Sequence, residues 1–362
     1  MNNDSKSTKD SALFVMDGVK GGHDGMNVSS KKKFRKKKQD EVDLVKLANE
    51  LRNGSRNSLA KAITLVESSN NQHKELAQAL LQELLPYTGK SIRIGITGVP
   101  GAGKSSFIEA FGMMLCNMGK RVAVLAIDPS SSLSGGSILG DKTRMEELSR
   151  DHRAFVRPSP SAGTLGGVHK KTRETMLLCE AAGYDVILIE TVGVGQSETY
   201  VRGMVDFFLL LVLTGAGDEL QGMKKGIMEL ADGIVVHKCD GDNVRSAKRT
   251  VREYKQILHF LQPATPGWMS KALPASSLEK VGLDEVWKMV CEFEQTIKES
   301  NFWEQRRNGQ TRDWYYSMIT DFLIDSFFNN PERKSHVKEI EASILQGELT
   351  VTQGVNKLFS NN

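Results

Sequence analysis

The segment Gly98–Ser105 reads Gly-Val-Pro-Gly-Ala-Gly-Lys-Ser, and it constrains the fold of this chain more than any other feature. It fits the pattern G-x-x-x-x-G-K-[ST], in which glycines let the backbone curl and turn its N–H groups toward a polyphosphate. The apolar run 92–96 precedes it and predicts a buried strand, and the apolar spacing in 106–115 predicts a helix. Because strand, loop and helix occur in this order, the motif predicts a nucleotide-binding site at a helix N-terminus.

Two side chains of this loop have expected tasks. Lys104 would reach the β- and γ-phosphate oxygens, and the Ser105 hydroxyl would ligate Mg²⁺. The alternative is a glycine-rich turn that matches by chance, which the flanking strand and helix patterns disfavour. The residues expected to hold the nucleotide phosphates are Gly98, Val99, Pro100, Gly101, Ala102, Gly103, Lys104, Ser105 and Ser106.

The net charge of the chain comes from one segment. The 362 residues carry a formal charge of +4, and removing the seven Lys and Arg residues of 31–38 leaves −3. A slightly acidic remainder argues against a general nucleic-acid-binding surface. We expect residues 1–40 to be disordered, with the basic run acting as a solvated tail or contacting RNA or an anionic membrane.

Cysteine spacing and apolar runs indicate the compartment. The four cysteines are widely spaced and form no C-x-x-C pair, and we find no secretory or transit-peptide pattern. The longest apolar run, 207–213, is too short to span a membrane and predicts a buried central strand. The sequence therefore predicts a cytoplasmic protein without a membrane span.

Strand and helix patterns alternate between residues 89 and 300. Strands are expected near 92–97, 121–127, 154–157, 185–190, 206–213, 233–238 and 272–275. Helices are expected near 104–118, 143–151, 168–182, 218–231, 242–261 and 283–300. This alternation predicts an α/β fold of the P-loop NTPase type, with a doubly wound, mostly parallel sheet. Ligands bind such sheets at the carboxyl ends of the strands.

Helical segments are expected on both sides of this nucleotide-binding region. Leucine spacing predicts an N-terminal helical segment over 41–88, and residues 301–362 predict a C-terminal helical region. The sequence thus predicts four regions along the chain: the tail 1–40, the helical segment 41–88, the nucleotide-binding domain 89–300 and the C-terminal helical region 301–362. The aromatic residues of the last part could form either core or an interface; they are Trp303, Trp314, Tyr315, Tyr316, Phe322, Phe327 and Phe328.

Two aspartates are expected near the metal ion. Asp128 follows the apolar run 122–127 and suits a carboxylate beside Mg²⁺, although Asp-Pro-Ser also forms turns. Asp141 lies in the glycine-rich segment 134–145, which is typical of a switch loop that orders around γ-phosphate and Mg²⁺. The alternative role of Asp141, as the N-cap of a helix, is compatible with a switch loop.

Glu190 ends a third apolar strand and is followed by glycines. The position suits binding of Mg²⁺ through water, and the Gly193 N–H can hydrogen-bond the γ-phosphate. Ras-like GTPases have a glutamine directly after this glycine to orient the attacking water, whereas this chain has Val194. We therefore expect slow hydrolysis without a partner, unless Gln196 or another residue substitutes.

Residues 237–240, at the end of the strand that begins at residue 233, predict which nucleotide base the site binds. In N-K-x-D loops, the aspartate accepts the ring N–H and the exocyclic amino group of guanine, and the lysine stem covers the base. This chain has His237, Lys238 and Asp240, so the first position departs from the pattern. Residues 276–278, which are Ser276, Ser277 and Leu278, resemble the Ser-Ala-Leu loop whose backbone amide contacts the guanine oxygen. GTP or GDP is thus the expected nucleotide.

Together these motifs resemble the methylmalonyl-CoA mutase-associated GTPases, the MeaB or ArgK family that includes the human cobalamin A-type protein. The resemblance covers about residues 41–360. Its most specific segments are 93–106, 126–131, 136–145, 190–198 and 217–222.

This resemblance implies a homodimeric GTPase that binds methylmalonyl-CoA mutase, gates delivery of adenosylcobalamin and protects or reactivates the mutase. A cobalamin adenosyltransferase could join the complex. In the family, the positions that match Lys104 and Ser105 bind phosphate and Mg²⁺, and those that match Asp128, Asp141 and Glu190 surround the metal and γ-phosphate. The loops near 135–145, 192–198 and 213–225 match three switches, and 302–329 matches a dimerisation arm. His237 stands where the family usually has Asn.

Three other functions share parts of this pattern. Nickel-inserting GTPases usually have His-rich or Cys-pair metal sites, and the seven histidines here are scattered. A P-loop kinase or ATPase linked to amino-acid transport, as the older ArgK name suggested, would use the same nucleotide pocket. A nucleic-acid-associated GTPase would use 31–38, against which the acidic remainder argues.

Overall fold

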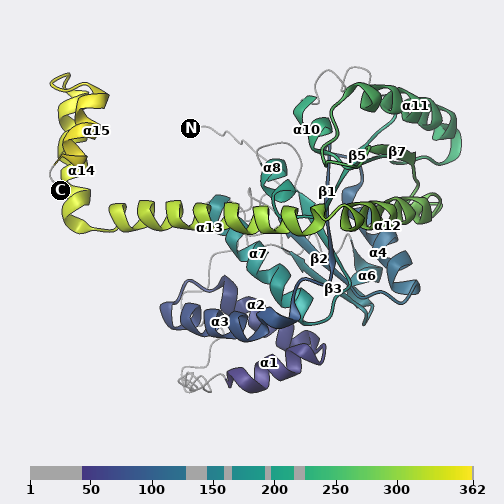
Figure 1. Cartoon of the computed structure of the whole chain (residues 1–362), viewed down its shortest axis with the longest axis horizontal. Coiled ribbons are helices and arrows are strands. Elements are labelled where there is room, and N and C mark those ends of the chain that lie inside the picture. The colour runs from purple at the N-terminus through teal and green to yellow at the C-terminus, as the bar shows by residue number, and fades with distance from the viewer. Residues whose placement is uncertain (1–42, 128–144, 159–164, 192–196, 216–224, 361–362) are drawn as a thin grey trace, which may run out of the picture. The chain divides into compact units, whose positions relative to one another are not determined.

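Seven apolar segments form one parallel sheet at the centre of the fold (Figure 1). The computed structural model describes residues 43–127, 145–158, 165–191, 197–215 and 225–360, so the predicted tail lies outside the described residues. The strands are β1 (Ile92–Gly98), β2 (Val122–Ile127), β3 (Ala154–Pro158), β4 (Val186–Thr191), β5 (Phe207–Val212), β6 (Gly233–Val236) and β7 (Lys271–Pro274). Their order is β3-β2-β4-β1-β5-β6-β7, and each neighbouring pair is parallel. The predicted doubly wound α/β sheet is confirmed.

Both faces of the sheet are covered, which explains the continuous apolar strands. Ile92, Ile94 and Ile96 of β1 pack in a core with α4 and α12. Leu125 and Ile127 of β2 pack on the other side, with α1, α2, α3 and α7. Parallel strands and crossover helices bring the carboxyl ends of all strands to one edge of the sheet.

The helices follow the predicted pattern closely. They are α1 (Leu44–Arg52), α2 (Arg56–Glu67), α3 (Asn71–Leu84), α4 (Lys104–Asn117), α6 (Glu146–Arg150), α7 (Leu165–Ala181), α8 (Ser197–Arg202), α10 (Lys225–Leu230), α11 (Val244–Phe260), α12 (Leu283–Glu299), α13 (Phe302–Phe328), α14 (Pro331–Leu345) and α15 (Val351–Phe359). Side chains cap the first three, since Asp43, Ser55 and Asn70 each accept a hydrogen bond from a backbone N–H of the following turn. The sequence did not predict α8. None of the described helices has the length and apolar character needed to cross a bilayer.

The first half of α13 is fixed to the sheet region. Arg307 donates to both carboxylate oxygens of Asp206 at 2.9 and 2.7 Å and to the Gly89 and Ser91 carbonyls at 2.6 and 2.7 Å. Gln310 donates to the Val205 carbonyl at 2.8 Å. These bonds tie α13 to the starts of β1 and β5.

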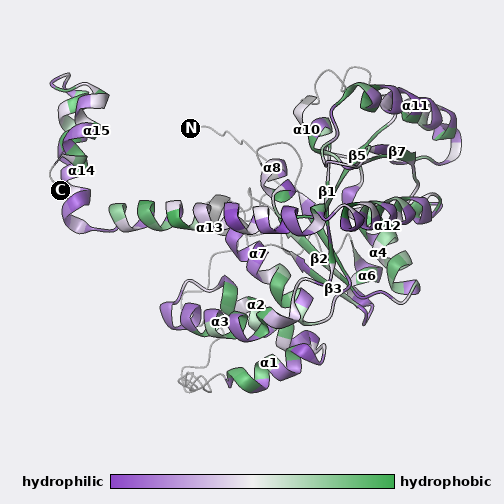
Figure 2. Cartoon of the chain, in the orientation of Figure 1, coloured by the Kyte–Doolittle hydropathy of each residue, from purple (hydrophilic) through white to green (hydrophobic). Residues whose placement is uncertain are grey.

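The second half of α13 has an exposed apolar face (Figure 2). Of the aromatic residues noted in the sequence, Trp303 is buried, which fits the core interpretation. The exposed apolar residues of α13 are Tyr315, Tyr316, Ile319, Phe322, Leu323, Ile324 and Phe328. The core alternative therefore applies to the start of α13, whereas an interface over its second half stays a prediction.

Candidate nucleotide-binding site

The phosphate loop joins β1 to α4 at the carboxyl edge of the sheet. A Cβ on Gly98 would lie 2.4 Å from the Leu211 carbonyl oxygen of β5. Gly103 has φ +83°, and a Cβ there would lie 2.9 Å from His237 Cε1. Only glycine fits these two positions, because backbone and ring atoms approach too closely for a side chain.

Lys104 begins α4 and folds back over the phosphate loop. Its Nζ donates to the carbonyls of Gly98 at 2.9 Å and Val99 at 3.3 Å. Burial lowers the pKa of this ammonium, and the carboxylates of Glu190 and Glu198 oppose the shift. The ammonium is thus held inside the curl of the loop, where phosphate oxygens would meet it.

Ser105 and Glu190 meet although they come from different elements. The Ser105 hydroxyl donates to Glu190 Oε1 at 2.9 Å. Beside them, Thr191 Oγ1 donates to Thr97 Oγ1 at 2.9 Å, which links the ends of β4 and β1. A hydroxyl beside a carboxylate supplies the oxygen ligands that Mg²⁺ prefers, so this pair fits the predicted metal.

Three predicted site residues, Asp128, Asp141 and Gly193, lie outside the described residues, as do Val194 and Gln196. Within the described part of the chain, no group of three or more His, Cys, Asp or Glu side chains could hold a metal ion. The roles of these residues therefore stay predictions.

A pocket of about 440 Å³ lies between the phosphate loop and the segment after β6. It is lined by Gly103, Ser106, Glu109, Ala110, Glu147, His237, Lys238, Asp240, Ser277, Leu278 and Lys280. The structure thus brings the predicted base-reading residues beside the phosphate loop. The sequence did not single out Glu109, Glu147 or Lys280.

Hydrogen bonds from neighbouring side chains hold the segment after β6. This strand ends at Val236, two residues earlier than predicted, and Lys238 adopts φ 57°. The Lys238 carbonyl accepts from Asn243 Nδ2 at 2.7 Å. Ser276 Oγ donates to Asp240 Oδ2 at 2.6 Å, so Ser276 stands behind the aspartate rather than lining the pocket. Asp240 is thereby fixed as an acceptor next to the pocket.

His237 bridges the phosphate loop and the 276–278 loop. The ring is 2% exposed, with Nδ1 2.6 Å from the Ala102 carbonyl and Nε2 2.6 Å from Ser277 Oγ. The Phe107 ring packs edge-on against it. The sequence showed the departure from asparagine but did not predict this bridge.

Leu278 offers an apolar surface at the pocket. Its side chain is 81% exposed, although it belongs to the pocket lining. A large exposed apolar side chain beside a polar pocket suits contact with the face of a flat base. Leu278 and the exposed Lys238 are therefore candidates to cover the two faces of a purine.

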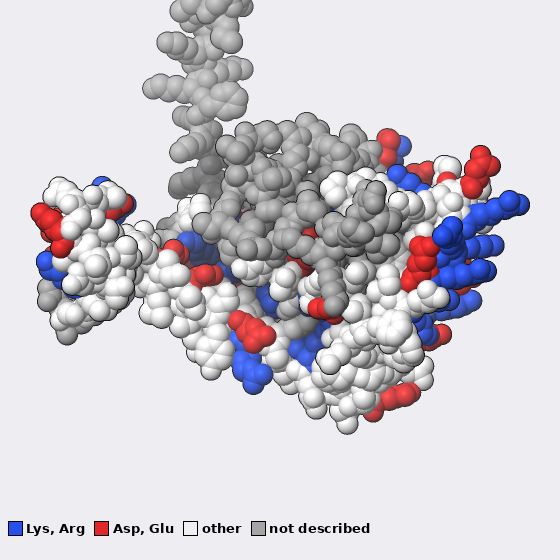
Figure 3. Space-filling model, turned by 90° about the horizontal axis from the view of Figure 1, so that it is seen from above, with Lys and Arg blue, Asp and Glu red and all other residues white. Residues whose placement is uncertain are grey.

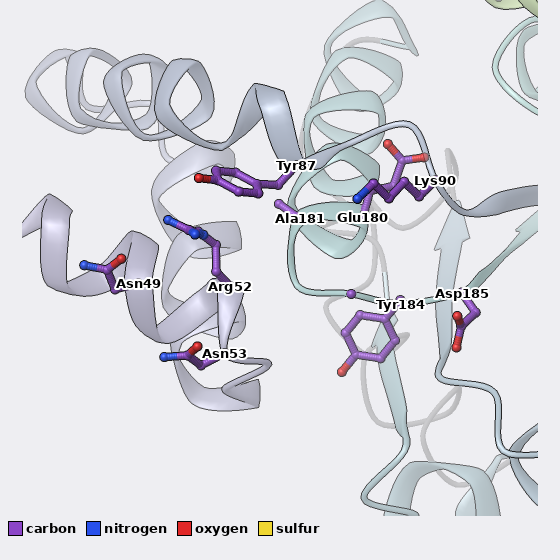
Figure 4. A pocket seen from close by; sticks show the side chains of 10 residues that line it. Asn49, Arg52, Asn53, Tyr87, Lys90, Glu180, Ala181, Tyr184 and Asp185 are labelled. Atoms are coloured by element: carbon purple, nitrogen blue, oxygen red, sulfur yellow. The ribbon is translucent and has the colours of Figure 1, made fainter.

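A second pocket, of about 420 Å³, lies where β1 and β4 begin (Figure 4). The Arg52 guanidinium lies 3.9 Å from the centre of the Tyr87 ring on one side, and Lys90 and Asp185 lie across from them. Glu180 also lines it, but its carboxylate accepts from Arg93 and Ser91. This pocket is at the edge of the sheet opposite to the phosphate loop, and sequence reasoning gave no sign of it.

The helix α11, which follows the base-reading segment, has a basic outer face. Figure 3 shows Lys and Arg side chains gathered in a row on this side of the molecule. The exposed cations of α11 are Arg245, Lys248, Arg249, Arg252 and Lys255. The slightly acidic charge of the chain without its tail therefore conceals a local basic surface.

Comparisons with known proteins identify the family of this chain. Residues 59–332 match a family model described as methylmalonyl Co-A mutase-associated GTPase MeaB. The chain is 45% identical over 319 residues to GTPase ArgK of Escherichia coli, covering 88% of this chain and 96% of that protein. It is 46% identical over 316 residues to the mitochondrial methylmalonic aciduria type A homolog of Mus musculus, covering 84% and 76%. A crystal structure of a LAO/AO transport system kinase has 39% identity and a TM-score of 0.71, covering 88% and 97%.

The parallel sheet and the phosphate loop at its carboxyl edge define a P-loop nucleotide-binding protein. The family model covers most of the chain, and the match covers 96% of the Escherichia coli protein and 76% of the mouse protein, so the class of GTPase can be stated more narrowly. The chain belongs to the MeaB family of mutase-associated GTPases and is a GTPase. The resemblance inferred from the motifs is confirmed.

Proposed function

We propose that this GTPase is a chaperone of an adenosylcobalamin-dependent methylmalonyl-CoA mutase. GTP binding and hydrolysis would gate delivery of the cofactor and protect or reactivate the mutase. The observation that carries the proposal is the match of residues 59–332 to a family described by its association with this mutase. The mouse relative, described as a methylmalonic aciduria type A homolog, supports the same metabolic link.

The contacts of the described residues support a proposal for how the nucleotide is held. The loop N–H groups and Lys104 would hold the phosphates, and Asp240 would accept from guanine. Ser105 and Glu190 would hold Mg²⁺, together with Asp128 and Asp141. When bound, Mg²⁺ supplies positive charge at the phosphate oxygens. The backbone N–H of Gly193 would contact the γ-phosphate and so make the segment 192–198 sensitive to the nucleotide.

We also propose that the chain is a homodimer through α13. A helix of 27 residues is about 40 Å long, and its second half exposes apolar side chains that water solvates poorly. A second copy would cover them.

The four free cysteines fit a reducing compartment, so we place the protein in the cytoplasm. A cobalamin adenosyltransferase is a further candidate partner of this complex.

The mutase proposal is tested with purified components. Size-exclusion chromatography of the chain with adenosylcobalamin-dependent methylmalonyl-CoA mutase should show a complex whose amount differs between GDP and a non-hydrolysable GTP analogue. The rate at which the mutase loses activity during turnover should fall when GTP is present. Lys104→Ala is the matched control, because it should abolish the nucleotide dependence. A complex that forms in no nucleotide state would contradict the proposal.

The transport-linked kinase is the second candidate, since a solved structure at 39% identity is described as such a kinase. Hydrolysis with GTP labelled in the γ-phosphate separates the two. We expect the label in inorganic phosphate. Label retained on a protein, including an added periplasmic binding protein, would favour the kinase.

The dimer is tested by sedimentation. Phe322→Asp should shift the chain toward monomer, because it places a charge in the proposed apolar contact. Phe260→Asp is the matched control, since Phe260 is 85% exposed but lies at the end of α11. Equal sedimentation of both variants and the unmodified chain as monomers would contradict dimerisation through α13.

A further inference from the structure

His237 lines the pocket proposed for the base, yet both of its ring nitrogens hydrogen-bond other groups of the protein. Nδ1 contacts the Ala102 carbonyl oxygen and Nε2 contacts Ser277 Oγ, each at 2.6 Å. The ring lines the pocket and is 2% exposed. No ring nitrogen is therefore left to hydrogen-bond a nucleotide.

The partners also determine which nitrogen holds the proton. A carbonyl oxygen only accepts, so Nδ1 must donate to Ala102. In the neutral ring Nε2 then accepts, and the Ser277 hydroxyl donates to it. Burial lowers the pKa of His237, which favours this neutral form. The Ser277 hydroxyl hydrogen is thus also committed to a protein partner.

We propose that no side chain of the described residues around this pocket reads N7 of the purine, because both His237 nitrogens are committed to protein partners. The proposal rests on the guanine-nucleotide binding inferred above and concerns one edge of the base. N7 is a hydrogen-bond acceptor, so reading it requires a donor. The other side-chain donors that line the pocket are Ser106, Lys238 and Lys280. Ser106 belongs to the phosphate loop and is expected at the phosphates, and Lys238 and Lys280 are exposed, so water solvates their ammonium groups.

A missing contact to N7 should not change the selectivity of the site between guanine and adenine. Guanine and adenine both have N7 as an acceptor, so losing a contact there weakens both purines alike. Discrimination is left to Asp240, which Ser276 holds in place. The exchange of asparagine for His237 thereby affects the affinity for purine nucleotides and leaves the preference for guanine intact.

The test compares GDP with 7-deaza-GDP, in which a C–H group replaces N7, by calorimetric titration of the full chain in Mg²⁺. The two dissociation constants should agree within about twofold. His237→Asn should restore a preference for GDP of roughly three- to tenfold, because one amide hydrogen can bond Ala102 and the other can face N7. Ser277→Ala is the matched control, since it frees an acceptor and adds no donor, so its ratio should stay near one.

A wild-type preference for GDP of tenfold or more would overturn the proposal, because some group would then read N7. A ratio near one in His237→Asn would overturn the role of His237. A preference for GDP in Ser277→Ala would show that Nε2 carries the proton, and so would overturn the tautomer argument. Absence of GDP binding in the wild type would contradict the guanine-nucleotide premise instead, and the GDP titration alone reveals it.

Discussion

The two ends of the nucleotide site are built by different means. At the phosphate end, backbone geometry sets the residues, since Gly98 and Gly103 have no room for a Cβ. At the base end, side chains hold one another, as Ser276 holds Asp240 and His237 spans two loops. A backbone constraint admits few substitutions, whereas a side-chain bridge can be rebuilt with another residue. This difference fits a phosphate motif that matches its pattern at every position and a base motif that departs from its pattern at His237.

The sharpest test of the phosphate end is Lys104→Ala. The ammonium lies inside the loop, and its loss removes the charge that would meet the β- and γ-phosphates. We expect the single-turnover rate of GTP hydrolysis to fall about 10²- to 10³-fold. Lys90→Ala, at the exposed Lys of the opposite pocket, should leave the rate unchanged. Comparable rates in the two variants would mean that Lys104 does not act on the phosphates.

The base end is tested next by Asp240→Asn. The amide can no longer accept both donors of guanine, so GDP should bind about 100-fold more weakly. The amide can instead donate to the extra carbonyl of xanthine, so XDP should bind more tightly than it does to the wild type. Calorimetry with both nucleotides measures the change, and Asp242→Asn is the control two residues away on an exposed side chain. Unchanged GDP affinity in Asp240→Asn would remove Asp240 from base recognition.

A smaller effect is expected from Ser276→Ala. The hydroxyl donates to Asp240 Oδ2 at 2.6 Å and does not line the pocket, so its loss loosens the aspartate without removing it. GDP should bind roughly three- to tenfold more weakly, while ADP binding stays the same. Ser246→Ala on the exposed surface of α11 is the control. An equal loss for GDP and ADP would show general destabilisation rather than positioning of Asp240.

The sequence predicted the sheet well because its strands are buried on both faces. Each strand boundary lies within two residues of the predicted one, the largest difference being the early end of β6. The helix α8 was missed because six residues are too few to show helical periodicity. Its last residue, Arg202, forms a buried ion pair with Asp232, which no local pattern indicates.

The candidate site was predictable where one element or one sheet edge sets the geometry. Lys104, Ser105 and Glu190 meet because β1 and β4 are neighbours and end together. The bridge through His237 was not predictable, because it depends on side-chain geometry among three loops separated by 135 and 40 residues. The pocket at the start of β1 joins residues as distant as Asn49 and Asp185, and no motif connects them.

The smallest predicted effect is a pH dependence of stability that arises at the base end. Burial lowers the pKa of His237, so the folded chain keeps this ring neutral at pH values where the unfolded chain binds a proton. The unfolded state then binds more protons, and the free energy of unfolding falls as the pH drops below about 6.5. The contribution is fully present above that pH. For one proton the slope is at most about 1.4 kcal/mol per pH unit.

Urea unfolding between pH 7.5 and 5.5 measures this slope. The stability of His237→Asn should fall less steeply toward low pH than that of the wild type, because asparagine does not titrate. The control is His259→Asn, which removes an exposed imidazole from α11 by the same substitution away from the pocket. Parallel curves for the wild type and His237→Asn would show that the buried ring takes up a proton as readily as in the unfolded chain. The base end would then tolerate a charged His237, with Nε2–H donating to Ser277, and the neutral-ring argument would not hold.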